Sequence, residues 1–499
     1  MKLCASWLAA FLCSTTLLAQ DWPQRGGSSG RNPVVPDVEF RIRPEGSDEK
    51  VDLQKRARWI AQLGDVSTGE PVVANGLVWV GTNNGNPRDA NQTKDASVLM
   101  CFRESDGKFL YQYVSPRLAP APGQVYWRRV DWPETSLASA PLVEGDRLWF
   151  CTNRCEVVCL DISQLLNGNG LPKVVWKYDM IEELGVQPRA TMIGSHASHS
   201  SVAGYRDFIY VNTTNGRNID GAVDGVGAPE APSLICLRKD DGKLQWQDNS
   251  PGTDIIYVQH GSPTLIEVER RAQVVMGQGD GWVRSFDALT GTMIWKFDIN
   301  PKGVKKHPFY NGNASHFVAT PVFHRNRLFI VGGRERELGA VDGTLFCLDP
   351  KQMGDISEEL LGEDGAALEN PNSGVIWKYV GHGEKRDEKM HSALSNVAVH
   401  NGLVIAPDDD GLVHCLDEQT GEWLWAYDCF SIVVGAPLIV GDRVYVTDED
   451  GDLAVLKLSR ELQLLEELSL RNTTESSPTF ANGTLYVSTR RSLMAIDGR

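Results

Sequence analysis

The chain has 499 residues, and its 65 acidic side chains outnumber its 49 basic ones, which gives a formal net charge of −16. A protein that binds nucleic acid by neutralising phosphates needs the opposite balance, so the composition excludes that class and disfavours an anionic membrane surface as a partner. Hydrophobic residues make up 41% and charged residues 23%, as in ordinary soluble domains, and the 48 glycines and 14 tryptophans are the informative excess.

Residues 1–19 have the pattern of a secretory signal peptide. Lys2 gives a positive start, Leu3 to Leu18 are apolar or small, and Ala19 is a small residue before a cleavage point near Gln20. The apolar run is short for a spanning helix, and no later stretch approaches ~18 uncharged apolar residues. We therefore expect an exported protein, periplasmic or extracellular, with no membrane span.

A repeated pattern begins beyond this segment and predicts the fold. Apolar residues, a turn and an alternating strand recur eight times, as in PLIVGDRVYVTD from Pro437 and PTFANGTLYVST from Pro478. The starts at Asn396, Pro437 and Pro478 are 41 residues apart, within the range of four-stranded propeller blades. The five earlier intervals are longer, which indicates insertions into the same unit.

A second element follows the first in the repeat. It is a strand, an Asp/Gly turn and a strand that ends in a large aromatic residue, as in SFDALTGTMIW and CLDEQTGEWLW. We expect these aromatic side chains to pack between neighbouring blades rather than to stack on a ligand. They are Tyr111, Trp176, Trp246, Trp295, Trp377 and Trp425.

The two ends of the repeat region complete each other. The eighth repeat stops at SLMAIDGR, one strand short, and ARWIAQL around Trp59 supplies a strand of the missing aromatic type. Joining first and last strands in one sheet removes a free edge and closes a ring. The sequence thus predicts an all-β, eight-bladed β-propeller over residues 56–499, with four antiparallel strands A to D in each blade. It also predicts an irregular N-terminal segment over residues 20–55, and a monomer.

Eight cysteines remain after removal of the signal. Cys151, Cys155 and Cys429 lie outside the common repeat position. Three roles are possible for them: packing, a local disulfide or metal binding. The C-x2-C spacing of zinc knuckles is absent. The other five recur at one position of separate sheets and so cannot meet; we expect them to be small buried packing residues. These are Cys101, Cys159, Cys236, Cys347 and Cys415.

Long insertions concentrate on one face of the predicted ring. The D-to-A and B-to-C connections of a four-stranded blade emerge on the same face, which we call the loop face. Its long connections are 83–97, 114–138, 179–200, 214–232, 247–262, 298–320, 334–342 and 380–395. The opposite face has two, 162–173 and 350–374. Loops on one face of a rigid scaffold commonly carry binding, so we expect function on the loop face.

Histidines and carboxylates near the starts of the innermost strands are the candidate ligand-binding residues. Strand A lies closest to the axis, so these side chains are candidates to converge at the channel mouth and to hold a small ligand or a transition metal. The alternative is that they are unrelated solvated residues around a wide polar ring. The candidates are Glu134, His199, His260, His316, His391 and Glu475.

Acidic and glycine-rich turns are weaker candidates. The runs Asp408–Asp410 and Asp448–Asp450 contain carboxylates, which calcium prefers, but they lack the spacing of a calcium loop, and Asp-Gly is ordinary chemistry for a tight turn. The stretch GQGDGW from Gly277 lies between two predicted strands, so it is not a dinucleotide-binding loop.

The chain resembles a known family of propellers. Its turn-and-Trp units, the start DWPQRG at Asp21, and the stretches NRCEVVCLD and GDGWVRSFDALTGTMIWKFD resemble bacterial secreted proteins with pyrroloquinoline-quinone-like (PQQ-like) repeats. The resemblance implies the propeller fold. It leaves the function open, because quinoprotein alcohol dehydrogenases and the scaffold lipoprotein of outer-membrane protein assembly share the repeat.

Three functions remain. The favoured one is an exported, noncatalytic propeller that binds a protein, glycan or envelope component through the loop face. The second, which the resemblance implies, is a dehydrogenase that holds PQQ and calcium and oxidises an alcohol or sugar. Against it, the chain has neither an adjacent cysteine pair nor a C-x-x-C-H haem site, and no cofactor-binding residue of the family can be assigned in this sequence. The third is an assembly scaffold, disfavoured because Leu12 stands where a lipoprotein signal needs a small residue.

Overall fold

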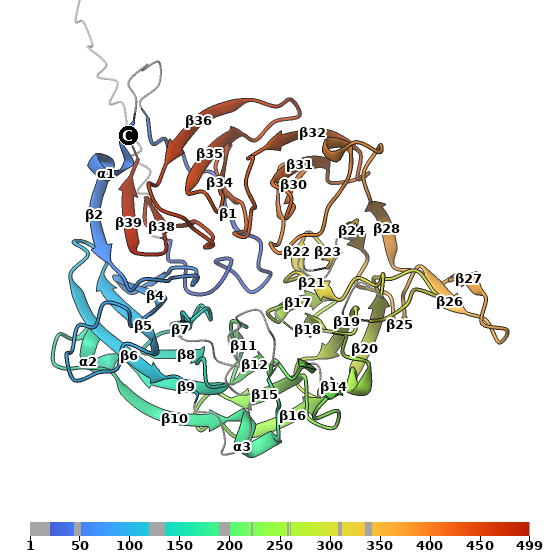
Figure 1. Ribbon diagram of the computed structural model, residues 1–499, viewed down its shortest axis with the longest axis horizontal. Helices are drawn as coiled ribbons and strands as arrows, with labels where there is room; N and C mark the ends of the chain where they lie inside the picture. The colour runs from blue at the N-terminus through green and yellow to red at the C-terminus, as the bar shows by residue number, and fades with distance from the viewer. Residues whose placement is uncertain are drawn as a thin grey trace, which may run out of the picture.

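The computed structural model describes residues 20–43, 51–118, 135–188, 200–220, 223–256, 259, 261–307, 312–334 and 342–498. Eight four-stranded antiparallel blades surround a common centre (Figure 1), which confirms the predicted eight-bladed propeller. The second strand of a blade is buried on both faces because neighbouring blades pack against it; all seven residues of β4 (Leu77–Asn83) are buried.

The strands follow one another from the axis outward in each blade. Blade 1 contains β3 (Val72–Ala74), β4, β5 (Ala96–Arg103) and β6 (Phe109–Pro116), and blade 2 contains β7 (Leu142–Glu144), β8 (Arg147–Cys151), β9 (Glu156–Asp161) and β10 (Lys173–Asp179). Blade 3 contains β11 (Ala203–Tyr205), β12 (Phe208–Asn212), β15 (Leu234–Arg238) and β16 (Leu244–Asp248). Blade 4 contains β17 (Thr264–Val268), β18 (Arg271–Gly277), β19 (Trp282–Asp287) and β20 (Met293–Asp298).

The second half of the ring repeats this arrangement. Blade 5 contains β22 (Val322–His324), β23 (Arg327–Gly333), β24 (Thr344–Leu348) and β28 (Val375–Tyr379), and blade 6 contains β29 (Ala398–His400), β30 (Leu403–Pro407), β31 (Leu412–Asp417) and β32 (Trp423–Asp428). Blade 7 contains β33 (Leu438–Val440), β34 (Arg443–Thr447), β35 (Asp452–Lys457) and β36 (Leu464–Ser469). Blade 8 contains β37 (Thr479–Ala481), β38 (Thr484–Ser488), β39 (Ser492–Asp497) and, from the other end of the chain, β2 (Ala57–Gln62).

Blade 8 joins the two ends of the chain as predicted. Strand β2 pairs antiparallel with β39, with Trp59 opposite Ala495 and Gln62 opposite Ser492. The helices are short: α1 (Leu53–Arg56), α2 (Ser163–Leu166) and α3 (Met180–Leu184). None of the helices in the described ranges has the length and apolar character needed to cross a membrane.

Residues 20–35 line the inside of the ring, and we call them the inner hoop. Sequence reasoning expected only an irregular segment here. The hoop follows the blades in order, and β1 (Val34–Val35) ends it as a parallel strand on β33 (Figure 1). Its main-chain carbonyls accept hydrogen bonds from the innermost strands or the turns after them, in the pairs Gln20–Asn482, Trp22–Val73, Pro23–Val143, Ser29–Leu265, Gly30–Phe323 and Pro33–Ile439. The hoop thus covers the inner strand edges, whose N–H groups would otherwise lack partners.

Two side chains extend this contact to the remaining blades. Asn32 exchanges two hydrogen bonds with the main chain of Val399 in blade 6, both 2.9 Å long. Arg31 is fully buried, and its guanidinium donates to the carbonyls of Val202 (3.0 Å) and Pro263 (3.2 Å) at the starts of blades 3 and 4. Burial lowers the pKa of Arg31 from 12.5 to about 9. This pKa is still above neutral pH, so the side chain keeps its charge there. Every blade is therefore tied to the hoop.

Tryptophans of the outer strands bridge neighbouring blades. Their indole Nε1–H groups donate to main-chain carbonyls in the turn between strands C and D of the next blade. The pairs are Trp59–Glu104, Trp176–Lys239, Trp246–Ala288, Trp377–Glu418 and Trp425–Ser459. The ring of Trp377 leaves room for glycine alone at Gly421, where a Cβ atom would lie 2.6 Å away. Trp295 instead donates to Gln273 of its own blade (3.2 Å).

All eight cysteines in the described ranges are free thiols. The five at the common repeat position are buried, as are Cys151 and Cys155. Cys155 has a positive φ of 62°, and its thiol donates to the carbonyl of Thr213 in blade 3 (3.2 Å). A contact between blades 2 and 3, rather than a disulfide, is what the structure shows for this residue.

Candidate functional site

The six predicted ligand-binding residues lie in different surroundings. Glu134, His199 and His260 fall outside the described residues. His316 is buried, and its main-chain N–H donates to Gly333 in blade 5 (3.0 Å). Glu475 is half-buried before blade 8, where burial raises the pKa of its carboxyl and the charge of Arg490 partly offsets that effect. His391 belongs to a cluster of charged groups on blade 6.

That cluster centres on Asp408, in the turn that follows β30. The side chain is fully buried, and its Oδ2 accepts hydrogen bonds from His391 Nδ1 (2.8 Å) and from His414 Nε2 in β31 (3.2 Å). Its Oδ1 accepts the main-chain N–H of Leu412 (2.9 Å) and so closes the turn. The carboxylate therefore orients two imidazoles as well as shaping the Asp-Gly turn.

The electrostatics of the cluster follow from these contacts. Burial alone would raise the pKa of Asp408, but the hydrogen bonds from the two imidazoles outweigh it and hold that pKa below 3.8. The hydrogen bond to Asp408 raises the pKa of His391 above 6.5. Nearby, Arg386 joins Asp428 (2.6 Å) and Asp410 (2.5 Å). The arrangement therefore favours the protonated imidazolium form of His391.

A basic cluster surrounds Trp282 at the loop-face end of blade 4, and we call it the Trp282 cluster. Four cationic groups lie within 6 Å of the centre of the indole ring, a distance at which the ring attracts them. They are Lys296 at 4.7 Å, Lys302 at 4.9 Å, Arg284 at 5.6 Å and Lys306 at 5.8 Å. The indole is half-buried.

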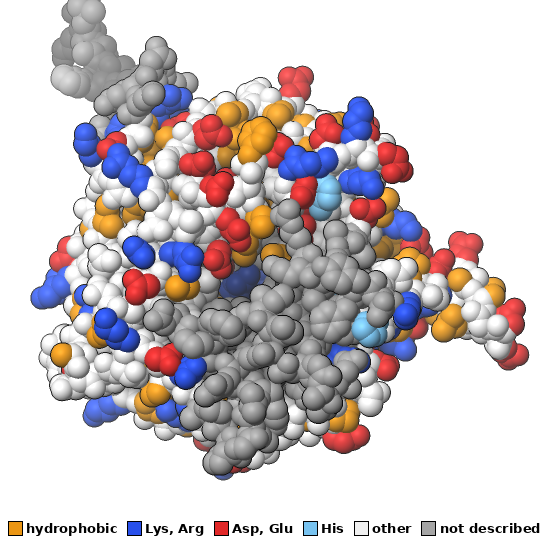
Figure 2. Space-filling model, viewed as in Figure 1, with side chains coloured by type: hydrophobic (Ala, Val, Ile, Leu, Met, Phe, Trp, Pro, Cys, Tyr) orange, Lys and Arg blue, Asp and Glu red, His pale blue; other side chains and the backbone are white. Residues whose placement is uncertain are grey.

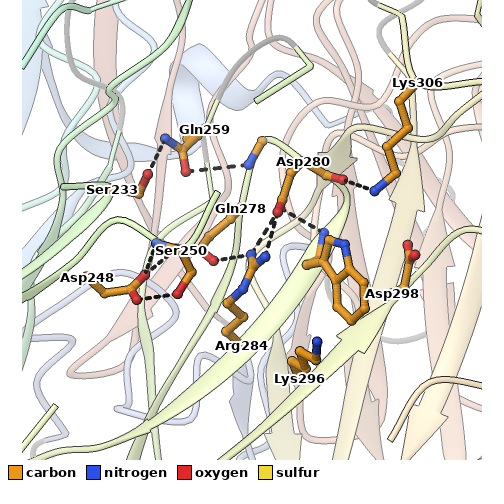
Figure 3. Close-up of polar contacts among 12 residues, drawn as sticks. Ser233, Asp248, Ser250, Gln259, Gln278, Asp280, Arg284, Lys296, Asp298 and Lys306 are labelled. Carbon is orange, nitrogen blue, oxygen red and sulfur yellow. Dashed lines mark hydrogen bonds and ion pairs between the residues drawn. The ribbon is translucent and has the colours of Figure 1, made fainter. Parts of the chain in front are cut away.

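Carboxylates neutralise part of this charge. Arg284 forms an ion pair with the buried Asp280 (2.6 Å), and Lys302 forms one with Asp298 (3.0 Å). Lys306 donates to the main-chain carbonyl of Asp280 (3.2 Å), and Figure 3 shows it reaching toward that residue from the side away from Arg284. Lys296, 3.6 Å from Asp355, has a side chain that is 41% exposed. Among the described residues, three of the four cations therefore pair with carboxylates, and Lys306 contacts a main-chain carbonyl instead.

Blade 3 holds the Trp282 cluster in position. Gln278 accepts from Arg284 and donates to Asp248 (3.1 Å), and Asp248 accepts from Ser250 (Figure 3). Gln259 donates to Ser233 (3.0 Å). These links order the turn before β19, so its side chains form a rigid part of the loop face.

Among the described residues there is no group of three or more His, Cys, Asp or Glu side chains that could hold a metal ion. Sequence reasoning identified His391, named Asp408 only as part of an acidic turn, and did not identify His414. It considered the stretch GQGDGW only as a dinucleotide-binding loop and rejected it. Two sequence signals could have indicated these clusters. His414 follows Asp408 by six residues, and three lysines (Lys296, Lys302 and Lys306) follow the turn residue Trp282.

The sequence matches a protein family over residues 112–345 and 366–499. The chain belongs to this family, which is described as outer membrane protein assembly factor BamB. No curated protein matches the chain.

Solved structures share the propeller fold. BamB from Moraxella catarrhalis superposes with a TM-score of 0.54 at 14% identity, over 88% of this chain and 98% of that one. A quinohemoprotein alcohol dehydrogenase from Pseudomonas putida HK5 gives 0.56 at 10% identity, over 96% and 81%. The computationally designed Ika8 protein gives 0.50 at 12% identity, over 87% and 98%. At these identities the likeness shows the fold alone.

Proposed function

We propose that the chain is an exported, noncatalytic binding propeller of the cell envelope that holds an anionic glycan on its loop face. One observation carries the proposal: four cationic groups surround the half-buried Trp282. An aromatic ring offers an apolar surface to a sugar, and lysines pair with its carboxylate or sulfate. The net charge of −16 repels long polyanions, so a short acidic segment is the ligand.

The proposal separates this chain from the two proteins whose fold it shares. The Pseudomonas putida protein is a quinohemoprotein, and this sequence has no C-x-x-C-H segment for haem attachment. At the level of the innermost strands the chain's own inner hoop lines the ring, with Arg31 fully buried. Family membership supports an envelope role, and a part in outer-membrane protein assembly remains the second candidate.

Calorimetric titration of the full-length protein with an oligogalacturonate tests the proposal, with a neutral galactose oligosaccharide as the matched ligand. We expect saturable binding of the acidic ligand alone, weakened by salt. Lys306→Gln should weaken it about tenfold, the effect of one charge-assisted contact. Trp282→Ala should weaken it by a similar factor, because the apolar surface under the sugar is lost. Lys243→Gln, an exposed lysine in a C-to-D turn on the opposite face, is the control and should change nothing.

Equal binding of both oligosaccharides, or unchanged binding of the acidic one by Trp282→Ala, would overturn the proposal. Binding that Lys243→Gln weakens as much as Lys306→Gln would show general charge attraction and contradict it as well.

A further inference from the structure

A two-stranded hairpin projects beyond the outline of the ring (Figure 1). It consists of β26 (Glu359–Leu361) and β27 (Ala367–Glu369), in the insertion between strands C and D of blade 5. Residues 346–365, which include β26, lie outside the ranges that match the family. The second strand, β27, lies inside the matched range, so the unmatched stretch ends within the hairpin. The hairpin is an insertion into the C-to-D turn of blade 5, and its function is to be sought in its own residues.

The base of the hairpin is rigid. Before it, β25 (Gly354–Asp355) pairs parallel with β20 as a fifth strand of blade 4, and Ile356 is fully buried. After it, the side chain of Asn370 donates to the carbonyls of Ser357 (2.8 Å) and Asp355 (3.0 Å). The hairpin is thus held at a fixed position on the ring.

The two strands beyond this base have apolar side chains in the open. Leu361 is 61% exposed and Leu368 is 53% exposed. Leu368 faces Leu360 across the strands, whereas Leu361 faces Ala367, so the two exposed leucines lie on opposite faces of the hairpin. Within the described residues neither strand has a second neighbour, so both outer edges are unpaired. A partner would cover both faces only by surrounding the hairpin.

The hairpin is acidic. Residues 358–369 contain five carboxylates and no lysine or arginine. Glu359 stands directly opposite Glu369, an arrangement that destabilises a strand pair. Glu358 pairs with Lys378 (2.6 Å), but in the described part of the chain Glu363 and Glu369 have no cationic partner. Figure 2 shows acidic and apolar side chains side by side on the projection.

We infer that this hairpin is a docking element that inserts into a groove of a second protein, one with an apolar floor and lysine or arginine at its rim. The groove takes Leu361 and Leu368, and its cations pair with Glu363 and Glu369. The inference does not rest on the glycan proposal, because its ligand is a protein. The side chains that it uses are those of Leu361, Leu368, Glu363 and Glu369, whereas the contact of the hairpin with the Trp282 cluster is made by Glu359, which accepts the main-chain N–H of Lys302 (3.1 Å).

The test places a photo-cross-linking side chain at Leu368 of the full-length protein in cells of the source organism. The control position is Leu171, in the other long C-to-D connection, which is 60% exposed and lies outside any acidic hairpin. We expect one major protein adduct from position 368 and none from 171. Glu363→Gln with Glu369→Gln should lower its yield at least fivefold, and the captured protein, once purified, should bind the wild type at least tenfold more weakly when salt is raised from 50 to 300 mM.

Adducts of equal yield from both positions, no adduct from 368, or an adduct unaffected by the Glu-to-Gln changes would overturn the inference. So would a captured lipid, a second copy of this chain, or a protein without a basic surface.

Discussion

The inner hoop and the projecting hairpin are both additions to the same eight repeats, yet they relate to the ring in opposite ways. The hoop contacts all eight blades, mostly through its main chain, and it buries Trp22 and Arg31. The hairpin joins the ring through Asn370 and through Glu359, which accepts the main-chain N–H of Lys302 (3.1 Å), and it exposes Leu361 and Leu368. An addition inside the ring becomes part of the structural core, whereas an addition outside it is free for recognition.

Replacing the central charge of the hoop should give the largest loss of stability. Arg31→Met removes the donors to the carbonyls of Val202 and Pro263 and leaves these buried groups without partners. We expect the free energy of unfolding to fall by about 3 kcal/mol. Urea unfolding followed by tryptophan fluorescence measures it.

The control is Arg325→Met, because Arg325 also has a positive φ but is exposed. Its effect should stay below about 0.5 kcal/mol. Equal effects of the two changes would show that the hoop is not part of the core.

A buried group on the loop face should give an intermediate, pH-dependent effect. Asp408→Asn removes the acceptor shared by His391 and His414, and we expect a loss of about 1–2 kcal/mol at pH 6. A histidine whose pKa is raised by folding contributes stability fully below its unfolded value, near 6.5, and loses that contribution as the pH rises through its folded value.

The difference between wild type and Asp408→Asn should therefore shrink from pH 6 to pH 8 in urea unfolding. Below pH 4 it should shrink again, because the lowered pKa of Asp408 gives stability that is lost as that carboxylate becomes protonated. Asp450→Asn replaces an exposed aspartate in the corresponding turn of blade 7 and should show neither trend.

Excision of the hairpin should have the smallest effect on stability. The main-chain N–H of Asn370 donates to the carbonyl of Glu358 (3.1 Å). If two glycines replace residues 359–369, Glu358 and Asn370 become the first and last residues of a four-residue turn, and the same hydrogen bond closes it. We expect a change below about 0.5 kcal/mol. A decrease in the melting temperature of 5 °C or more would contradict the separation of the hairpin from the core.

The fold was predictable because each blade needs the same local chemistry: a turn residue at fixed offsets, alternating strands and an aromatic side chain at the blade contact. The missing strand of the eighth repeat even predicted the pairing of β2 with β39. The inner hoop was not predictable, because its bonds use the carbonyls of Pro23, Ser29, Gly30 and Pro33, which any sequence would supply.

The sites were less predictable for a related reason. His391 was a candidate from its place before a strand, but its partner Asp408 lies in another connection, and an Asp-Gly turn is fully explained by turn chemistry. Lys296, Lys302 and Lys306 meet Trp282 only after two strands pair side by side. Such clusters depend on which connections become neighbours, and the spacing of repeats does not encode that detail.

The position of the hoop also sets an order of events in time. Residues 20–35 and β2 are synthesised first, yet Gln20 bonds to Asn482 and β2 pairs with β39, which are synthesised last. Hundreds of residues separate these partners, and contacts of such long range slow folding. The main-chain groups of these N-terminal residues therefore stay hydrogen-bonded to water until the last blade has been synthesised and can pair with them. The ring therefore closes as a late event, and a chain that is truncated at its C-terminus cannot complete it.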